Sequence, residues 1–313
     1  MPTPIPQDIE FKPEFLQRYQ ALLGSEFDRF IEYSSMYIRK AVRVNTLKIS
    51  VQALVKRLEK HWRLTPVPWC PEGFWIEHRY EERFDIGNLP EHALGYLYVQ
   101  DPASMIPPVV LAPEPGDVVL DLCAAPGSKT TQLGALMQNE GVLIANDVAA
   151  SRLTPLGMNV QRCGLKNCVV TLRANKQFAQ VFDKVLVDAP CSGTGTIRRS
   201  LRVARMWSPS LVRRMVHDQR GLLRRGYELL KPGGVLVYST CTLEPEENEG
   251  VVSWLLTREP GASLEPISLA IKRQPAVSSW RGEVYDPRVK DCLRILPQDN
   301  DTEGFFVARI RKA

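Results

Sequence analysis

The chain has 313 residues, of which 44% are hydrophobic and 24% charged, with a formal net charge of +5; this composition is typical of a globular protein. No apolar run approaches the roughly 18 residues of a membrane span, and the opening Met-Pro-Thr-Pro-Ile-Pro lacks a signal peptide's apolar core, so we expect a cytoplasmic protein without membrane contacts. Seven cysteines, without any Cys-x-x-Cys pair, argue against a disulfide framework and against a metal site.

The first hundred residues follow a pattern of their own. Apolar residues recur at helical spacing from Phe15 to Tyr37, which predicts one or two amphipathic helices. Three shorter elements are predicted after them: a strand over Ala41–Ile49, a helix over Val51–His61 and a strand over Gly73–Glu77. We therefore expect residues 1–100 to form a small α+β module. A proline-rich passage then leads into a second domain, residues 101–313.

From Asp117 onward, predicted strands alternate with predicted helices. The strands are short apolar runs over Val118–Leu122, Val142–Asn146, Val169–Leu172, Lys184–Val187, Val235–Tyr238 and Phe305–Ile310. The helices are predicted over Ser128–Met137, Ser151–Cys163, Pro209–Leu230 and Glu246–Thr257. Alternation of this kind is typical of an α/β fold with a doubly wound, mostly parallel sheet.

Two cysteines each follow a predicted buried strand. Cys191 lies in Asp188-Ala-Pro-Cys, and Cys241 lies in Tyr238-Ser-Thr-Cys-Thr. Ligands of open α/β sheets bind at the carboxyl ends of strands. Two thiols at that edge, beside the carboxylate of Asp188, indicate a site that forms and releases a covalent bond, whereas a lone cysteine would usually be a small buried hydrophobic residue.

The turn from Asp121 to Thr130 has the small residues of a ligand-binding loop, because they let backbone amides approach a ligand where a helix begins. A nucleoside triphosphate would need a second glycine where Ser128 stands, and a dinucleotide would need Gly-x-Gly-x-x-Gly, which is absent. S-adenosylmethionine needs an acid after the second strand, and Asp147 stands there, about 20 residues past the loop. The alternative is a structural turn with Asp147 as a helix cap.

Between Arg198 and Arg225 the chain carries nine arginines and one acid, Asp218. Such a stripe suits a polyanion such as nucleic acid, although a solvated helix face is the alternative. Because the stripe begins directly after the Cys191 loop, we expect its first arginines to contact phosphates of such a polyanion: Arg198, Arg199, Arg202 and Arg205.

Several motifs together resemble the RsmB/Sun-type RNA (cytosine-5)-methyltransferases, in particular the short archaeal tRNA and rRNA enzymes. They are Asp121-Leu-Cys-Ala-Ala-Pro-Gly-Ser-Lys-Thr, Asp188-Ala-Pro-Cys-Ser-Gly-Thr-Gly, Tyr238-Ser-Thr-Cys-Thr, Pro245-Glu-Glu-Asn-Glu, Arg43-Val-Asn-Thr-Leu and Gly304-Phe-Phe. The resemblance spans nearly the whole chain. It implies a Rossmann-like class I methyltransferase domain preceded by a small α+β RNA-binding domain.

The resemblance also implies roles for individual residues. Cys241 would be the nucleophile and Cys191 would assist product release, while Asp188 would lie between cofactor and target base with Lys129 nearby. The remaining residues would bind S-adenosylmethionine: Cys123, Ala124, Ala125, Pro126, Gly127, Ser128 and Lys129 around its methionine and ribose, Asp147 on the ribose hydroxyls, and Arg152 in support. Asn175 stands where the family commonly has an acid, and its amide oxygen could accept from the adenine amine.

The implied chemistry explains why these groups are needed. Carbon 5 of cytosine is a weak nucleophile, and a thiolate that adds to carbon 6 activates it by covalent catalysis. Positive charge from Lys129 and helix N-termini would lower the pKa of the attacking thiol. Asp188 would act as an acid toward ring nitrogen 3. The target base must also be unstacked, which costs least in single-stranded or loop RNA.

We therefore predict a monomeric, S-adenosylmethionine-dependent RNA (cytosine-5)-methyltransferase that forms a covalent Cys241–cytosine adduct, with tRNA favoured over ribosomal RNA. Two other readings stay open. A DNA cytosine methyltransferase would attack with the Pro-Cys thiol, Cys191, and would not need the second thiol. A non-catalytic RNA-binding assembly factor could share the fold without using either thiol. A nucleotide hydrolase is disfavoured by the incomplete phosphate loop.

Overall fold

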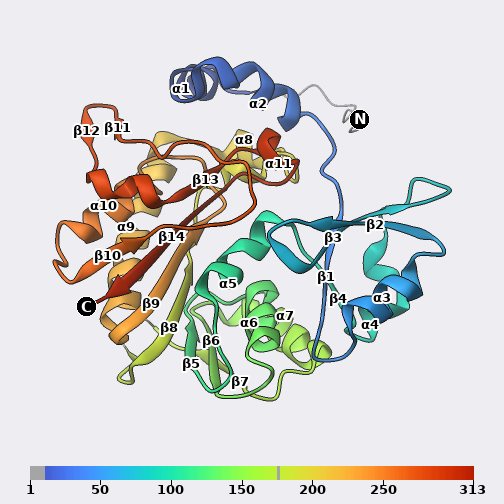
Figure 1. Cartoon of the computed structure of the whole chain (residues 1–313). Coiled ribbons are helices and arrows are strands. Elements are labelled where there is room, and N and C mark those ends of the chain that lie inside the picture. Colours follow the sequence, from blue (N-terminus) through green and yellow to red (C-terminus); the bar gives the residue numbers. More distant parts are fainter. Residues whose placement is uncertain (1–10, 175–176) are drawn as a thin grey trace.

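The computed structural model describes residues 11–174 and 177–313, most of them around one large β-sheet (Figure 1). Parallel strands lie in the order β7-β6-β5-β8-β9: Cys168–Leu172, Val142–Asp147, Val118–Asp121, Phe182–Asp188 and Leu230–Thr240. Antiparallel strands extend the β9 edge, namely β14 (Phe305–Lys312), β10 (Ala262–Glu265) and β13 (Leu293–Ile295). The predicted doubly wound, mostly parallel sheet is confirmed.

The direction of winding changes between β5 and β8. The chain passes from β5 outward to β6 and β7, then returns to β8 and β9 on the other side of β5. Ligands in doubly wound sheets bind outside the carboxyl ends of strands at this switch point. Asp121 ends β5 and Asp188 ends β8, so the fold brings both predicted ligand loops to one place.

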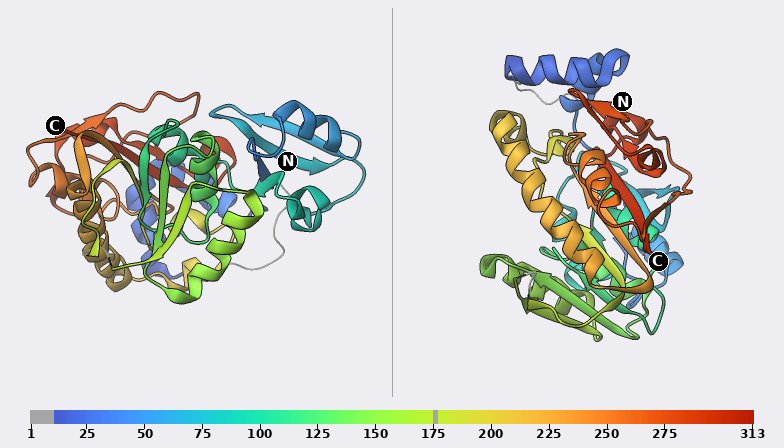
Figure 2. Two further views of the ribbon diagram at one scale, coloured as in Figure 1. Left: turned by 90° about the horizontal axis from the view of Figure 1, so that it is seen from below. Right: turned by 90° about the vertical axis from the view of Figure 1, so that its left-hand side faces the viewer.

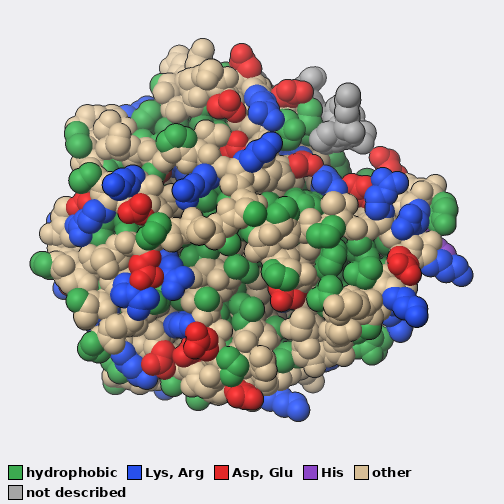
Figure 3. Space-filling model, in the orientation of Figure 1, with side chains coloured by type: hydrophobic (Ala, Val, Ile, Leu, Met, Phe, Trp, Pro, Cys, Tyr) green, Lys and Arg blue, Asp and Glu red, His purple; other side chains and the backbone are tan. Residues whose placement is uncertain are grey.

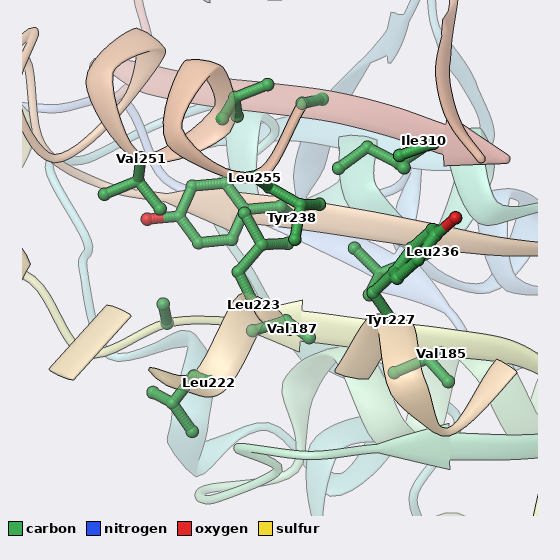
Figure 4. Packing of buried hydrophobic residues seen from close by; sticks show 14 of the residues in the cluster. Val185, Val187, Leu222, Leu223, Tyr227, Leu236, Tyr238, Val251, Leu255 and Ile310 are labelled. Atoms are coloured by element: carbon green, nitrogen blue, oxygen red, sulfur yellow. The ribbon is translucent and has the colours of Figure 1, made fainter. Parts of the chain in front are cut away.

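Helices cover both faces of the large sheet. One face packs against α9 (Pro209–Glu228) and α10 (Glu249–Leu256); Figure 4 shows this core, with Leu222, Leu223 and Tyr227 of α9 against Val185, Val187, Leu236 and Tyr238 of the sheet. The opposite face packs against α5 (Ile106–Leu111) and α6 (Ser128–Leu136), with α7 (Ala150–Cys163) beside α6. Burial on both faces explains why the strands are continuous apolar runs.

The first hundred residues divide into two structural parts (Figures 1 and 2). Helices α1 (Pro13–Leu23) and α2 (Phe27–Ser34) pack near α8 (Arg202–Met206) and α11 (Pro297–Asn300), in a core with Trp207 and Leu296. A separate antiparallel sheet has the order β2-β3-β1-β4: Trp62–Val67, Cys70–His78, Ala41–Val44 and Leu97–Val99. Helices α3 (Val51–Leu58) and α4 (Pro90–Ala93) accompany this sheet.

Every element that the sequence predicts is present, although its ends are shifted. The predicted strand Ala41–Ile49 stops at Val44, because the chain then turns: the backbone amides of Lys48 and Ile49 both donate to the carbonyl oxygen of Asn45. Several strands were not predicted: β2, β4, β10, β13 and the hairpin of β11 (Ser279–Trp280) and β12 (Glu283–Val284). They are short or, like β2, interrupted by proline, so they lack a clear period. Within the described ranges no helix combines the length and apolarity that crossing a bilayer requires.

Candidate active site

The two thiols predicted to act together are in contact. Strands β8 and β9 are parallel neighbours with Asp188 opposite Ser239, so the loops that follow them leave the same edge of the sheet. The Sγ atoms of Cys191 and Cys241 lie 3.3 Å apart, close enough for one thiol to donate a hydrogen bond to the other sulfur. Both residues are partly accessible. The structure therefore brings together the pair that the sequence places after separate strands.

A pair of a buried lysine and a partly exposed aspartate stands beside the thiols. Lys129, at the start of α6, lies with its Nζ 2.6 Å from Oδ2 of Asp188, and the hydroxyl of Ser239 donates to Oδ1 over 2.7 Å. Burial would lower the pKa of Lys129, but the carboxylate of Asp188 outweighs this effect and the pKa is raised. Lys129 is therefore a fixed positive charge at the carboxyl end of β8.

A network of side chains behind the sulfur atoms joins the two thiol loops. The hydroxyl of Thr242 lies 2.7 Å from that of Ser192 and 2.9 Å from that of Thr194. Glu247 accepts from the backbone amide of Ser192 over 2.9 Å and from the side chain of Gln219 over 2.8 Å. Burial raises the pKa of Glu247 to about 7. Sequence analysis assigned Glu247 no role, although its Pro-Glu-Glu-Asn motif marked the segment.

The surroundings treat the two thiols differently. The hydrogen bond with Cys241, followed by burial, raises the pKa of Cys191 well above its usual value. Cys191 is therefore held as a neutral thiol in contact with the sulfur of Cys241. Lys129 and Arg199 line the same cavity as Cys241, so two cationic side chains stand around its sulfur.

Two adjoining cavities open at this edge of the sheet. The first, of about 450 Å³, is lined by Cys241, Asp188 and Lys129 together with residues that include Lys40, Tyr98, Asp101, Arg199, Glu303 and Phe305. The second, of about 800 Å³, lies between the ends of β5 and β6 and helix α9, and its lining includes Leu122, Asp147, Val148, Ala174, Pro190 and Leu222. Cys123 and Arg152 line both cavities, which therefore meet at the loop after β5.

The second cavity has the features expected of a nucleoside site. Asp147 ends β6, and its buried Oδ2 accepts no hydrogen bond from the described residues, although Nη1 of Arg152 lies 3.3 Å away. Its other oxygen accepts from the backbone amide of Ala149 over 3.0 Å, as the helix-cap alternative predicts. Asp147 therefore caps the helix with one oxygen and can accept from a ligand with the other. Gly127 has φ +104°, and a Cβ there would lie 3.1 Å from Leu156.

The loop after β5 is held from behind by α7. Arg152 donates to the carbonyl oxygen of Ala125 over 2.6 Å, and Asn159 donates to that of Pro126 over 2.9 Å. These hydrogen bonds hold the segment from Cys123 to Lys129 at the junction of the two cavities. A nucleoside that bears a methionine chain would fit such a junction. Asn175, predicted beside the adenine, lies outside the described residues, but its neighbour Ala174 lines the second cavity.

Comparison with known proteins identifies the family to which the chain belongs. Residues 108–311 match the family described as 16S rRNA methyltransferase RsmB/F, and residues 11–102 match the N-terminal domain of 16S rRNA methyltransferase RsmF. The chain belongs to the RsmB/RsmF family of RNA (cytosine-5)-methyltransferases. Membership confirms the resemblance drawn from the motifs and assigns the large sheet to the methyltransferase fold.

Relatives in this family carry names for two kinds of RNA. The chain is 44% identical to the tRNA (cytosine(49)-C(5))-methyltransferase of Pyrococcus abyssi, over 97% of this chain and 99% of that one. It is also 44% identical to the ribosomal RNA small subunit methyltransferase F of Cronobacter sakazakii, over 92% of this chain but only 60% of that one. A methyltransferase homologue from Pyrococcus horikoshii has a crystal structure with a TM-score of 0.87, 39% identity, and coverage of 97% and 96%.

One predicted phosphate contact of this RsmB/RsmF protein is wrong. Arg198 is 4% exposed, and its guanidinium donates to the carboxylate of Asp301 over 2.7 Å and to the carbonyl oxygen of Tyr37 over 2.9 Å. It is a structural residue and cannot reach RNA. Arg199, Arg202 and Arg205 are exposed as expected, and Arg199 also lines the first cavity, 3.3 Å from Glu303.

Helix α1 contacts the segment that follows Cys241, which sequence analysis did not predict. Glu244 is completely buried and accepts from Arg18 over 2.7 Å, from Tyr19 over 3.0 Å and from the indole of Trp207 over 2.7 Å. The pairing joins residues more than 220 positions apart in the chain. The helical spacing of Phe15 and Tyr19 indicated a buried face on α1 but not its partner.

Proposed function

We propose that this protein methylates carbon 5 of a cytosine in RNA with S-adenosylmethionine as methyl donor, and that Cys241 is the nucleophile. The observation that carries the proposal is the pair of sulfur atoms 3.3 Å apart beside a cavity that Lys129 and Asp188 also line. Two thiols in contact can divide between them the formation and the release of one covalent bond. A fold that only bound RNA would need neither of them.

The second cavity is the proposed site of S-adenosylmethionine. Asp147 would accept from the ribose hydroxyls through its open oxygen, and Arg152 would keep that carboxylate in place. The segment Cys123–Lys129 would surround the methionine part, where the two cavities meet. When bound, the cofactor supplies an electrophilic methyl group. Asn175 stays a predicted contact to the adenine.

In the proposed first step the sulfur of Cys241 bonds to carbon 6 of the cytosine, which shifts electron density to carbon 5 and makes that carbon nucleophilic. Lys129 and Arg199, which line the cavity with Cys241, would supply the positive charge that a thiolate nucleophile needs. The Lys129–Asp188 pair would pass a proton to ring nitrogen 3 as negative charge develops there and would take it back when the cytosine ring is restored. A positioned acid of this kind contributes about 10²–10⁴-fold to a rate.

In the proposed release step Cys191 takes the proton from carbon 5. The electron pair of that C–H bond re-forms the double bond between carbons 5 and 6 and expels the sulfur of Cys241. The hydrogen bond with Cys241 is the largest cause of the raised pKa of Cys191 in the free protein. Once Cys241 is bonded to carbon, that interaction is lost, so Cys191 can ionise more easily and act as a base.

Separate replacement of the two thiols tests these roles. We expect Cys241→Ala to abolish methyl transfer and to form no adduct. We expect Cys191→Ala to leave a protein–RNA adduct that survives a denaturing gel, because carbon 5 keeps its proton. Cys168→Ala, a thiol in β7 outside both cavities, is the matched control and should turn over normally. An adduct in Cys241→Ala but none in Cys191→Ala would show that the roles are exchanged.

We further propose tRNA as the substrate, with residues 1–100 contributing RNA contacts. The archaeal relative named as a tRNA enzyme and this chain cover each other almost completely, whereas the chain spans 60% of the Cronobacter ribosomal enzyme. Ribosomal RNA is the second candidate, because the matching family descriptions name 16S rRNA. Bisulfite sequencing of unmodified tRNA and 16S rRNA, each incubated with the protein and S-adenosylmethionine, decides between them.

A further inference from the structure

A third cavity, of about 420 Å³, adjoins the first. Its walls are the linker between α2 and β1, the end of β3 with the segment that follows it, and Asp301. Ile38, Arg39 and Lys40 line both this cavity and the one that contains Cys241. These three residues therefore form a wall shared by the third cavity and the first. Neither the fold nor the chemistry described so far assigns this site a ligand.

An aromatic pair forms part of the third cavity. The rings of Tyr37 and Phe84 have centroids 4.6 Å apart with an interplanar angle of 39°. Phe84 is 47% exposed, so one side of its ring contacts Tyr37 while much of the remainder faces solvent. An exposed phenylalanine at a cavity wall is a platform on which a base can stack, and such stacking tolerates any base because each has a π-face.

The charges of the third cavity show which part of a nucleotide it suits. Arg39 is paired with Glu77 over 3.1 Å, and Arg83 with Asp85 over 2.9 Å, so both guanidinium charges are compensated. Further acids, Glu81 and Glu82, also line the cavity, and basic and acidic side chains are mixed over the β2–β3 end of the molecule (Figure 3). A phosphate inside the cavity would meet this negative charge, whereas a base with exocyclic amines would find acceptors.

Lys40 differs from the two arginines. Within the described ranges it forms no ion pair, and its Nζ lies 5.2 Å from the ring centroid of Tyr37. It also lines both cavities, so its uncompensated charge stands where the backbone between two neighbouring nucleotides would pass. A single lysine in this position suits one phosphate, as a point charge that does not read sequence.

We propose that the third cavity receives the base of the nucleotide next to the target cytosine, stacked on Phe84, and that Lys40 binds the phosphate between the two nucleotides. The proposal rests on the RNA methyltransferase function proposed above. In this arrangement two nucleotides leave the RNA stack together: the cytosine enters the first cavity and its neighbour enters the third. Stacking of the neighbour offsets part of the few kcal/mol that unstacking costs.

The test is a coupling measurement on a tRNA transcript whose methylated cytosine has been mapped. Abasic residues are introduced one at a time at the positions flanking that cytosine, and KM for methyl transfer is measured with the unaltered protein and with Phe84→Ala. We expect Phe84→Ala to raise KM about fivefold to a hundredfold. We also expect one abasic position to raise KM by a similar factor in the unaltered protein and to have little further effect in the variant.

Controls separate the possible outcomes. Tyr80→Ala removes an aromatic ring that is 75% exposed and does not line the cavity, and it should leave KM unchanged. Lys40→Gln should lower the slope of log Kd against log salt concentration by about one, measured by anisotropy, and exposed Lys56→Gln should not. If abasic substitutions cost the same in Phe84→Ala as in the unaltered protein, the neighbour site is refuted. If no RNA accepts a methyl group at all, the proposed function fails with it.

Discussion

Replacing Arg18 with methionine tests how strongly α1 holds the segment after Cys241. The guanidinium of Arg18 is paired with Glu244 and with Glu246, and the side chains of Arg18 and Glu244 are 2% and 0% exposed. Removing one partner of a buried ion pair costs about 3–5 kcal/mol, because the other charge is left uncompensated. Glu244 keeps its hydrogen bonds from Tyr19 and Trp207, so we expect the lower end, about 3 kcal/mol.

The loss of stability in Arg18→Met should be larger at neutral pH than at acidic pH. Burial raises the pKa of Glu244 in the folded protein, and the charge of Arg18 opposes that rise. Without Arg18 the folded pKa moves further above the unfolded one. A carboxyl group with a raised folded pKa destabilises the fold at pH values above its unfolded pKa, and the penalty disappears as pH falls below that value. The difference between variant and unaltered protein should therefore be largest at neutral pH and shrink toward pH 4.5.

Urea unfolding at pH 7.5 and pH 5 measures both effects. Arg29→Met on α2 is the matched control, since Arg29 is exposed, and it should change the free energy of unfolding by less than about 0.5 kcal/mol. Adding Glu244→Gln to Arg18→Met should restore part of the loss, because the buried charge is then absent. A loss below about 1 kcal/mol that does not vary with pH would refute the reasoning, since it would be in the range of a surface pair.

Two further predictions concern catalysis and RNA binding. Glu247→Gln should weaken the hydrogen bond to the backbone amide of Ser192 and slow product release about tenfold, which would be seen as a protein–RNA adduct that accumulates during turnover. Because burial raises the pKa of Glu247 to about 7, the side chain is charged at pH 8 and largely neutral at pH 6, so the effect should be greater at pH 8. Turnover equal to that of the unaltered protein at both pH values would contradict this role. Charge reversal at Arg202 or Arg205 should weaken RNA affinity and lower its salt dependence in anisotropy titrations between 50 and 200 mM salt, whereas Arg198→Ala should lower the melting temperature instead.

The sheet and the thiol pair could be predicted from the sequence because both depend on local patterns. Runs such as Val185–Val187 and Val235–Tyr238 are apolar on both faces, which marks central parallel strands. Once two such strands are neighbours, the residues just past their carboxyl ends must approach each other. The sulfur atoms of Cys191 and Cys241 accordingly lie in contact although fifty residues separate them. The alternation of elements predicted that both thiols lie at one edge of the sheet, and the structure adds the strand order that makes β8 and β9 neighbours.

The partners of buried charges could not be predicted in the same way. Arg198 and Arg202 stand in one arginine-rich stretch, yet one is buried and the other exposed. The difference arises because Asp301, about a hundred residues later, and the carbonyl oxygen of Tyr37 meet the guanidinium of Arg198. The distribution of charged residues along the sequence indicates how many cationic side chains are available to a surface. Only the tertiary fold decides which of them are already paired.

The acidic segment after Cys241 shows what the buried charges do together. Glu244 binds Arg18 of α1, Glu247 holds the Cys191 loop, and Glu249 pairs with Arg294 of β13 over 3.1 Å. Three parts of the chain that are remote in sequence are therefore attached to one turn next to the nucleophile proposed here. Each acid is almost completely buried and would destabilise the fold without its partner. The position of Cys241 consequently depends on the docking of α1 and β13, so loss of either contact should disturb the thiol pair before it disturbs the parallel strands of the sheet.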